Sequence, residues 1–193
     1  MNECEKTYWS AFYTARSHAN RPSPFAQWVV AKVPSIPSLS RPLKVLDCGS
    51  GNGRDTYFLA DSLGQALGVD ASFRPQETEK ATFQEGNFVT WNKDGFDVIY
   101  SRFSYHSITD EMQQRFWNSL PSGSWLFLET RSSIDRDCER EHGDGHYRNF
   151  TDASKILSDA NKFATKVFLQ IGRGMAKYRG EDPMVLRLIC RVR

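Results

Sequence analysis

Residues 45–55 read Val-Leu-Asp-Cys-Gly-Ser-Gly-Asn-Gly-Arg-Asp, an apolar run that leads into a cluster of glycines. Buried parallel strands have such runs, and glycine at the end of a strand allows a sharp turn and a close approach of a ligand to the backbone. The next apolar run, residues 66–70, ends in Asp70, whose carboxylate can accept hydrogen bonds from both hydroxyls of a ribose. A strand, a glycine turn, a helix and a second strand ending in an acid together predict a nucleoside-binding crevice.

The rest of the chain alternates between apolar runs and helical patterns. Strands are expected at residues 43–48, 66–70, 82–88, 96–100 and 125–129, and helices at residues 56–63, 111–120 and 151–161. The polar stretch from 71 to 81 is short, so a turn is expected there in place of a full helix. Residues 163–171 and 184–193 alternate like the strands of an antiparallel hairpin. This order predicts an α/β fold, with a doubly wound, mostly parallel seven-stranded sheet and an antiparallel C-terminal hairpin strand.

The first 42 residues are expected to form an N-terminal helical cap and a proline-rich connector, ahead of a domain that covers residues 43–193. Helices are expected at residues 3–17 and 25–32. One face of the first helix carries four aromatic residues, Tyr8, Trp9, Phe12 and Tyr13. Two interpretations of this face stay open. It covers a bound ligand as a lid, with Tyr8 or Phe25 in contact, or it covers one edge of the sheet.

The composition narrows the class of protein. A chain of 193 residues fits one domain, and its 25 basic and 23 acidic residues give a net charge of +2, too low for a nucleic-acid surface. The four cysteines are scattered, which favours free thiols in a reducing compartment. The N-terminus has no apolar signal segment, and no apolar run approaches the ~20 residues of a membrane span. We therefore expect a cytoplasmic protein that contacts neither membrane nor nucleic acid.

The motifs resemble those of class I S-adenosylmethionine-dependent methyltransferases, as a small bacterial-type, single-domain member. Residues 45–53 are similar to the first motif of that family, 68–70 to its second, 85–88 to the segment that borders the adenine, and 96–101 to the strand beside the methionine moiety. The resemblance implies that Asp47 lies near the amino group of the methyl donor and that Asp70 holds its ribose. It implies further cofactor-binding residues at Gly49, Ser50, Gly51, Arg54, Ala71, Asn87, Phe88 and Ser101.

At two of these positions the role implied by the family is open to an alternative. The family often has aspartate where this chain has Asn87, although an amide can still bond the adenine edge. Phe88 is expected to pack on the adenine ring, and ordinary core packing stays open as the alternative.

The methyl acceptor is expected to bind in loops that follow the strand ends. His106 is the candidate general base because its unperturbed pKa lies near ~6.5, and helix capping is its alternative role. Glu129 is the second candidate catalytic group. The candidate acceptor-binding residues are Arg102, Arg131, His146, Arg148 and Tyr8. The charged residues among them suit an anionic or polyhydroxylated small molecule, with a solvated salt-bridge network as the alternative. His142 and His146 come without an obvious third ligand, so no metal is expected.

These features predict a methyltransferase that uses S-adenosylmethionine for in-line methyl transfer to a small acceptor. An NAD-binding oxidoreductase is the first alternative. Its G-x-G-x-x-G fingerprint fails at the third glycine, where Thr56 would obstruct close packing of helix on strand. A non-catalytic scaffold that binds S-adenosylmethionine is the second alternative. The sequence fixes neither the atom that is methylated nor the oligomeric state.

Overall fold

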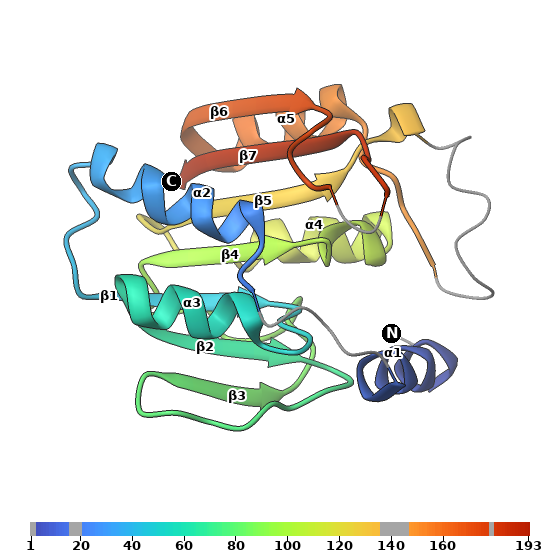
Figure 1. Ribbon diagram of the computed structural model, residues 1–193. Coiled ribbons are helices and arrows are strands. Elements are labelled where there is room, and N and C mark those ends of the chain that lie inside the picture. Colours follow the sequence, from blue (N-terminus) through green and yellow to red (C-terminus); the bar gives the residue numbers. More distant parts are fainter. Residues whose placement is uncertain (1–2, 16–20, 136–146, 178–179) are drawn as a thin grey trace.

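The protein is built on one twisted sheet of seven strands, ordered β3-β2-β1-β4-β5-β7-β6 (Figure 1). The computed structural model describes residues 3–15, 21–135, 147–177 and 180–193. The strands are β1 (Leu43–Cys48), β2 (Gly64–Asp70), β3 (Ala81–Glu85), β4 (Val98–Arg102), β5 (Trp125–Arg131), β6 (Ala164–Gly172) and β7 (Val185–Val192). β1 to β5 pair in parallel, and β7 lies antiparallel between β5 and β6. The predicted doubly wound sheet with its antiparallel hairpin is confirmed.

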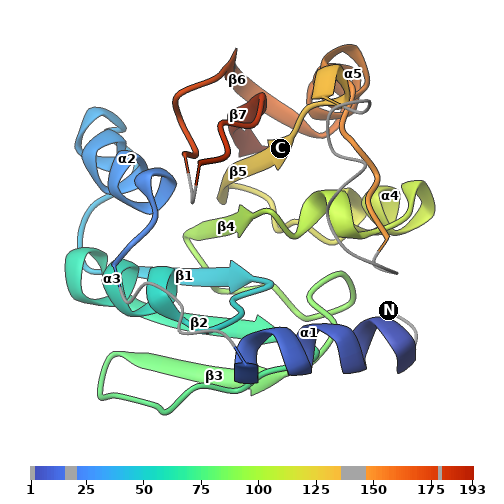
Figure 2. The same ribbon diagram turned by 45° about the vertical axis from the view of Figure 1, so that its right-hand side comes forward.

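Helices cover both faces of the sheet (Figure 2). They are α1 (Glu3–Ala15), α2 (Pro24–Lys32), α3 (Arg54–Leu63), α4 (Asp110–Asn118) and α5 (Ala153–Phe163), with short 3-10 turns η1 (Val33–Ser35), η2 (Tyr105–Ser107) and η3 (Ser133–Asp135). α2 and α3 lie on one face, where Phe25 and Leu59 pack against Val45 of β1. α4 and α5 lie on the other face and bury Phe116 and Ile156 there. Helices therefore pack on both faces of the central parallel strands, as the near-continuous apolar runs of such strands require.

The helix starts are set by local capping. The Ser23 hydroxyl accepts the Ala26 N–H at the start of α2, and Thr109 and Asp152 cap α4 and α5 in the same way. Side-chain oxygens at these positions satisfy backbone N–H groups that have no partner within the helix. Residues 71–80 form bends and irregular backbone in place of a full helix, as predicted. The connection between β2 and β3 therefore contains no helix.

α1 takes a different position from the other helices. It lies beyond the carboxyl ends of the central strands rather than on a face of the sheet (Figures 1 and 2). The Lys6 ammonium pairs with the Glu85 carboxylate at the end of β3, at 2.6 Å. α2, by contrast, is part of the main core, since Phe25, Ala26 and Val29 are fully buried.

Candidate functional site

A cavity of about 910 Å³ lies at the carboxyl ends of the parallel strands, beneath α1. This volume is in the range of small-molecule sites, and the place is where open α/β sheets bind their ligands. Every strand from β1 to β5 contributes a polar residue near its carboxyl end, namely Asp47, Asp70, Glu85, Arg102 and Arg131. The cavity therefore collects side chains that are far apart in the sequence.

The glycine turn forms one wall of the cavity. Gly49 and Gly51 have φ angles of 79° and 53°, a left-handed conformation that residues with a Cβ rarely adopt. A Cβ at Gly51 would also collide with the hydroxyl of Tyr13. The Gly51 N–H donates to Asp70 Oδ2 at 3.0 Å, so the turn and the acid of the next strand are locked together.

The Asp70 carboxylate is oriented by its remaining neighbours. Its Oδ1 accepts hydrogen bonds from the Ser72 N–H at 2.9 Å and the Ser72 hydroxyl at 2.7 Å. Ser50, in the glycine turn, also lines the cavity, and its Oγ is a buried oxygen for which no hydrogen-bond partner is found among the described residues. A buried hydroxyl without a partner is costly unless a ligand or water satisfies it, which fits a ligand at this turn.

Asp47 lies deeper, at the end of β1. It is buried, and the Thr56 hydroxyl donates to its Oδ2 at 2.6 Å. Burial raises the pKa of Asp47 to about 8, and the nearby Asp55 and Asp70 act in the same direction. Thr56 stands where the dinucleotide-binding fingerprint requires its third glycine. Its hydroxyl instead orients Asp47, for which that fingerprint has no role.

The two residues predicted to border the adenine, Asn87 and Phe88, line the cavity just after β3. Gly86 and the predicted cofactor-binding residue Ala71 line it as well. Asn87 Oδ1 accepts the Val89 N–H at 3.0 Å and caps the turn that follows β3. Phe88 is half-buried and makes an edge contact with Phe116, with ring centroids 6.0 Å apart. Phe88 thus borders the cavity and also packs against the core.

Two further cofactor candidates lie differently. Arg54 lines the cavity at the start of α3. Ser101 is fully buried, and its hydroxyl lies 2.7 Å from that of Ser104, which donates to the Cys48 carbonyl at 2.6 Å. Ser101 therefore supports Ser104 from below, and Ser104 is the serine that lines the cavity.

α1 covers the cavity with aromatic side chains. Tyr8, Trp9, Phe12 and Tyr13 all line it. Tyr13 reaches furthest toward the glycine turn, and burial, followed by the charge of Asp70, raises its pKa. Phe25 is instead buried in the core, stacked on Tyr100 with ring centroids 5.1 Å apart. Tyr8 and Phe25 were the two aromatic residues expected to contact a ligand, and of these Tyr8 lines the cavity. Tyr13, which was not singled out, lines it too.

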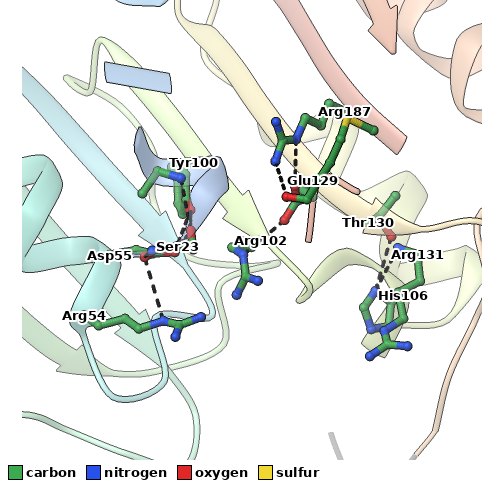
Figure 3. A network of polar contacts seen from close by, with 12 residues as sticks. Ser23, Arg54, Asp55, Tyr100, Arg102, His106, Glu129, Thr130, Arg131 and Arg187 are labelled. Carbon is green, nitrogen blue, oxygen red and sulfur yellow. Dashed lines mark hydrogen bonds and ion pairs between the residues drawn. The ribbon is translucent and has the colours of Figure 1, made fainter. Parts of the chain in front are cut away.

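Tyr13 was one of four aromatic residues on the predicted face, and no sequence signal separates it from the other three. Asp55 was not predicted as a site residue either. It accepts hydrogen bonds from Ser23 and from the Tyr100 hydroxyl, each at 2.7 Å, and so ties α2, α3 and β4 together beside the cavity (Figure 3).

The end of β4 carries a buried ionic group (Figure 3). Glu129 is 0% exposed and lies between the guanidinium groups of Arg102, at 3.1 Å, and Arg187, at 2.7 Å. Burial raises the pKa of Glu129, while both arginines oppose that shift. Glu129 was expected to take part in the chemistry, and in the structure its fully buried carboxylate contacts the two arginines. Arg102 is the member of the group that lines the cavity.

His106 and Arg131 form the neighbouring part of the rim. His106 is buried in η2 yet lines the cavity, and its Nδ1 lies 3.3 Å from the Thr130 hydroxyl. α4 is capped by Thr109, so the capping role considered for His106 does not apply. The Arg131 guanidinium pairs with Glu181 at 3.3 Å.

The last predicted acceptor residues, His146 and Arg148, precede α5 in the sequence. Arg148 lines the cavity, as Arg131 does. His146 lies outside the described residues. Among the residues that the structure describes, no three His, Cys, Asp or Glu side chains gather as a metal site would require. Within the same residues, no helix has the length and apolarity to cross a membrane.

The chain belongs to the methyltransferase domain family, whose model matches residues 18–163. That match begins before the predicted domain boundary at residue 43 and ends before β6. No curated protein matches the chain. The resemblance to class I methyltransferases that the motifs indicated is thereby confirmed.

Solved structures share the fold at low sequence identity. An S-adenosylmethionine-dependent methyltransferase from Anabaena variabilis ATCC 29413 has a TM-score of 0.68 and 17% identity, covering 100% of this chain and 96% of that one. The 1,6-didemethyltoxoflavin-N1-methyltransferase of Burkholderia thailandensis, solved with 1,6-didemethyltoxoflavin and S-adenosylhomocysteine, has a TM-score of 0.70 and 16% identity, covering 98% and 87%. The magnesium protoporphyrin IX methyltransferase of Synechocystis PCC 6803, solved with S-adenosylhomocysteine, has a TM-score of 0.61 and 14% identity, covering 85% and 81%.

Proposed function

We propose that the protein binds S-adenosylmethionine in the cavity under α1 and transfers its methyl group to a small molecule bound beside it. The observation that carries this proposal is that Asp47, the glycine turn and Asp70 line one cavity together with arginines at the ends of β4 and β5. Membership of the methyltransferase domain family and the S-adenosylhomocysteine held by two proteins of the same fold support it.

The chain's own residues fit this methyl donor. Asp70 can accept the ribose hydroxyls, because its carboxylate is already fixed by Gly51 and Ser72. Asn87 and Phe88 can border the adenine, and Asp47 can pair with the amino group. When bound, S-adenosylmethionine supplies a methyl group activated by a sulfonium, so the protein mainly has to bind and align the acceptor.

The acceptor is proposed to be anionic or polyhydroxylated, bound by Arg102, Arg131 and Arg148. His106 is the group proposed to take a proton from an acceptor hydroxyl or amine, because it lines the cavity and is oriented by Thr130. Glu129 is proposed as a positioning residue that holds Arg102. Tyr8 and Tyr13 would close the site from the side of α1.

Calorimetric titration tests the proposal. Saturable binding of S-adenosylhomocysteine, with no binding of NAD, is the expected result. Saturable binding of NAD alone would support the oxidoreductase alternative. Tight binding of S-adenosylmethionine without product from a broad acceptor panel would favour the non-catalytic scaffold.

The binding of S-adenosylhomocysteine is expected to strengthen as pH rises toward 8. The pKa of Asp47 is about 8 against its ordinary 3.8, so in the free protein this group is largely protonated at neutral pH. Its surroundings are Thr56, Asp55, Asp70 and Arg102. The ammonium of the ligand favours the ionised carboxylate, so binding releases a proton below pH 8. Affinity should rise by up to about tenfold per pH unit between about pH 6 and pH 8.

Asp47→Asn supplies the control for this pH dependence. Because the pKa of the acid is raised in the folded state, the folded protein binds more protons than the unfolded chain between about pH 4 and pH 8. The free energy of unfolding should therefore fall as pH rises through this window, and the variant should lose that pH dependence.

For ligand binding, calorimetry in two buffers of different ionisation enthalpy measures the proton that is released. If the affinity for S-adenosylhomocysteine changed with pH equally in both proteins, Asp47 would not be the group that releases the proton.

A further inference from the structure

Phe103, which follows β4 directly, has an unusual backbone. Its φ angle is 57°, in the left-handed region that a residue with a Cβ enters only at a cost. The Phe103 N–H donates to the Glu129 carbonyl at 2.9 Å, which fixes this conformation. Strained residues persist where the surrounding structure holds them, and they concentrate at functional sites. Glycine would adopt this backbone without strain, so the phenyl ring itself needs an explanation.

Two guanidinium groups and an imidazole ring lie around the phenyl ring. The guanidinium of Arg102 lies 4.4 Å from the ring centroid and that of Arg131 lies 5.4 Å from it. The His106 ring follows at 5.6 Å. Both guanidinium groups pair with acids, Arg102 with the buried Glu129 and Arg131 with Glu181, which also lines the cavity. Phe103, Arg102 and Arg131 all line the cavity, and we call these three residues the Phe103 wall.

Charged side chains of both signs line the cavity. Asp47, Asp55 and Asp70 lie at or near the glycine turn, where Arg54 pairs with Asp55, and these acids suit a methyl donor that carries an ammonium and a sulfonium. Arg102, Arg131 and Arg148 also line the cavity. The three arginines favour a negative acceptor by the same electrostatics that favour a positive donor at the acids.

We propose that the methyl acceptor is a planar aromatic anion, whose ring stacks against the Phe103 wall and whose anionic group pairs with Arg131. This inference rests on the proposed function and narrows its acceptor class. Guanidinium planes both stack on aromatic rings and pair with carboxylates, and the Phe103 wall offers both interactions. Tyr8, Trp9 and Phe12 of α1 add aromatic surface to the same cavity. A planar aromatic ring matches this flat aromatic surface more closely than a polyhydroxylated acceptor does.

The test is a titration of the protein saturated with S-adenosylhomocysteine. The probes are benzoate, salicylate and 2-naphthoate, their neutral amides, and cyclohexanecarboxylate as an anion without a planar ring. At least one aromatic anion is expected to bind about tenfold or more tightly than its amide and than cyclohexanecarboxylate. If S-adenosylhomocysteine binds but no aromatic anion shows this preference, the inference is overturned and the proposed function stands. If S-adenosylhomocysteine itself does not bind, the proposed function fails.

Two variants separate recognition from packing. Phe103→Gly relieves the backbone strain but loses the contacts of the ring, so its thermal midpoint should stay close to that of the wild type. Its affinity for S-adenosylhomocysteine should stay within about threefold, because that ligand uses other residues, while the preference for aromatic anions should disappear. Phe103→Leu keeps the apolar bulk and the strain, and it should lose the same preference. A preference that survives in both variants would assign the ring to packing and overturn the inference.

Discussion

Replacing Glu129 by glutamine is expected to lower the free energy of unfolding by about 3 kcal/mol, as for other buried ion pairs that lose one partner. The carboxylate is fully buried between Arg102 and Arg187. Without its charge, the guanidinium of Arg187, itself only 5% exposed, stays buried without a counter-ion. Urea unfolding with linear extrapolation measures the change.

Glu111→Gln is the matched control for this prediction. Glu111 also pairs with an arginine, Arg115 at 2.7 Å, but both side chains are mostly exposed. Surface ion pairs of this kind contribute little to stability, so the free energy of unfolding of this variant should be close to that of the wild type. A comparable loss in both variants would mean that burial does not set the importance of Glu129. The affinity for S-adenosylhomocysteine should be retained in Glu129→Gln wherever the variant is folded.

The fold was predictable because its decisive signals are local. The apolar run of β1, the glycine turn and the acid at the end of β2 each follow from a few neighbouring residues. The differences lie at element ends. β4 was expected at residues 96–100 and runs over Val98–Arg102. Asp97 instead bonds Lys44, its N–H donating to the Lys44 carbonyl and its Oδ2 accepting the Lys44 N–H at 2.8 Å. Such pairing depends on a second strand and leaves no mark in the local pattern.

The site residues at the ends of strands were predictable from the sequence. The contacts that depend on how neighbouring strands are paired in register were not. Asp47, Asp70 and Arg131 come directly from the strand pattern, and all three line the cavity. The burial of Glu129 depends on its neighbours across the sheet, since it lies opposite Arg102 of β4 and opposite Arg187 of β7. The sequence shows an acid at the end of an apolar strand but not which cations face it.

The position of Tyr13 has a similar cause. The aromatic face of the first helix is visible as a pattern, yet the residue that reaches the glycine turn is set by how α1 lies across the strand ends. The Lys6–Glu85 ion pair contributes to that placement. These contacts join segments far apart in the chain, so local periodicity carries no information about them.

Asp70→Asn is expected to weaken the binding of S-adenosylhomocysteine by roughly 10- to 100-fold, or about 1.5–3 kcal/mol, as for hydrogen bonds to a charged group. The carboxylate offers two charged oxygens at the carboxyl end of β2, and an amide offers one uncharged oxygen. Asparagine is preferred to alanine here. It keeps an oxygen for the Gly51 N–H, whereas alanine would also release the glycine turn.

Isothermal titration of both proteins with S-adenosylhomocysteine measures the change, and thermal unfolding checks that the variant is folded. Asp61→Asn, an exposed position on α3, is the control and should bind like the wild type. The loss in Asp70→Asn should persist at high salt, because a partly enclosed charged hydrogen bond is screened less than a surface pair. An Asp70→Asn variant that is folded and binds S-adenosylhomocysteine as tightly as the wild type would mean that this carboxylate only shapes the glycine turn, and the ribose would then have to be held elsewhere on the cavity wall.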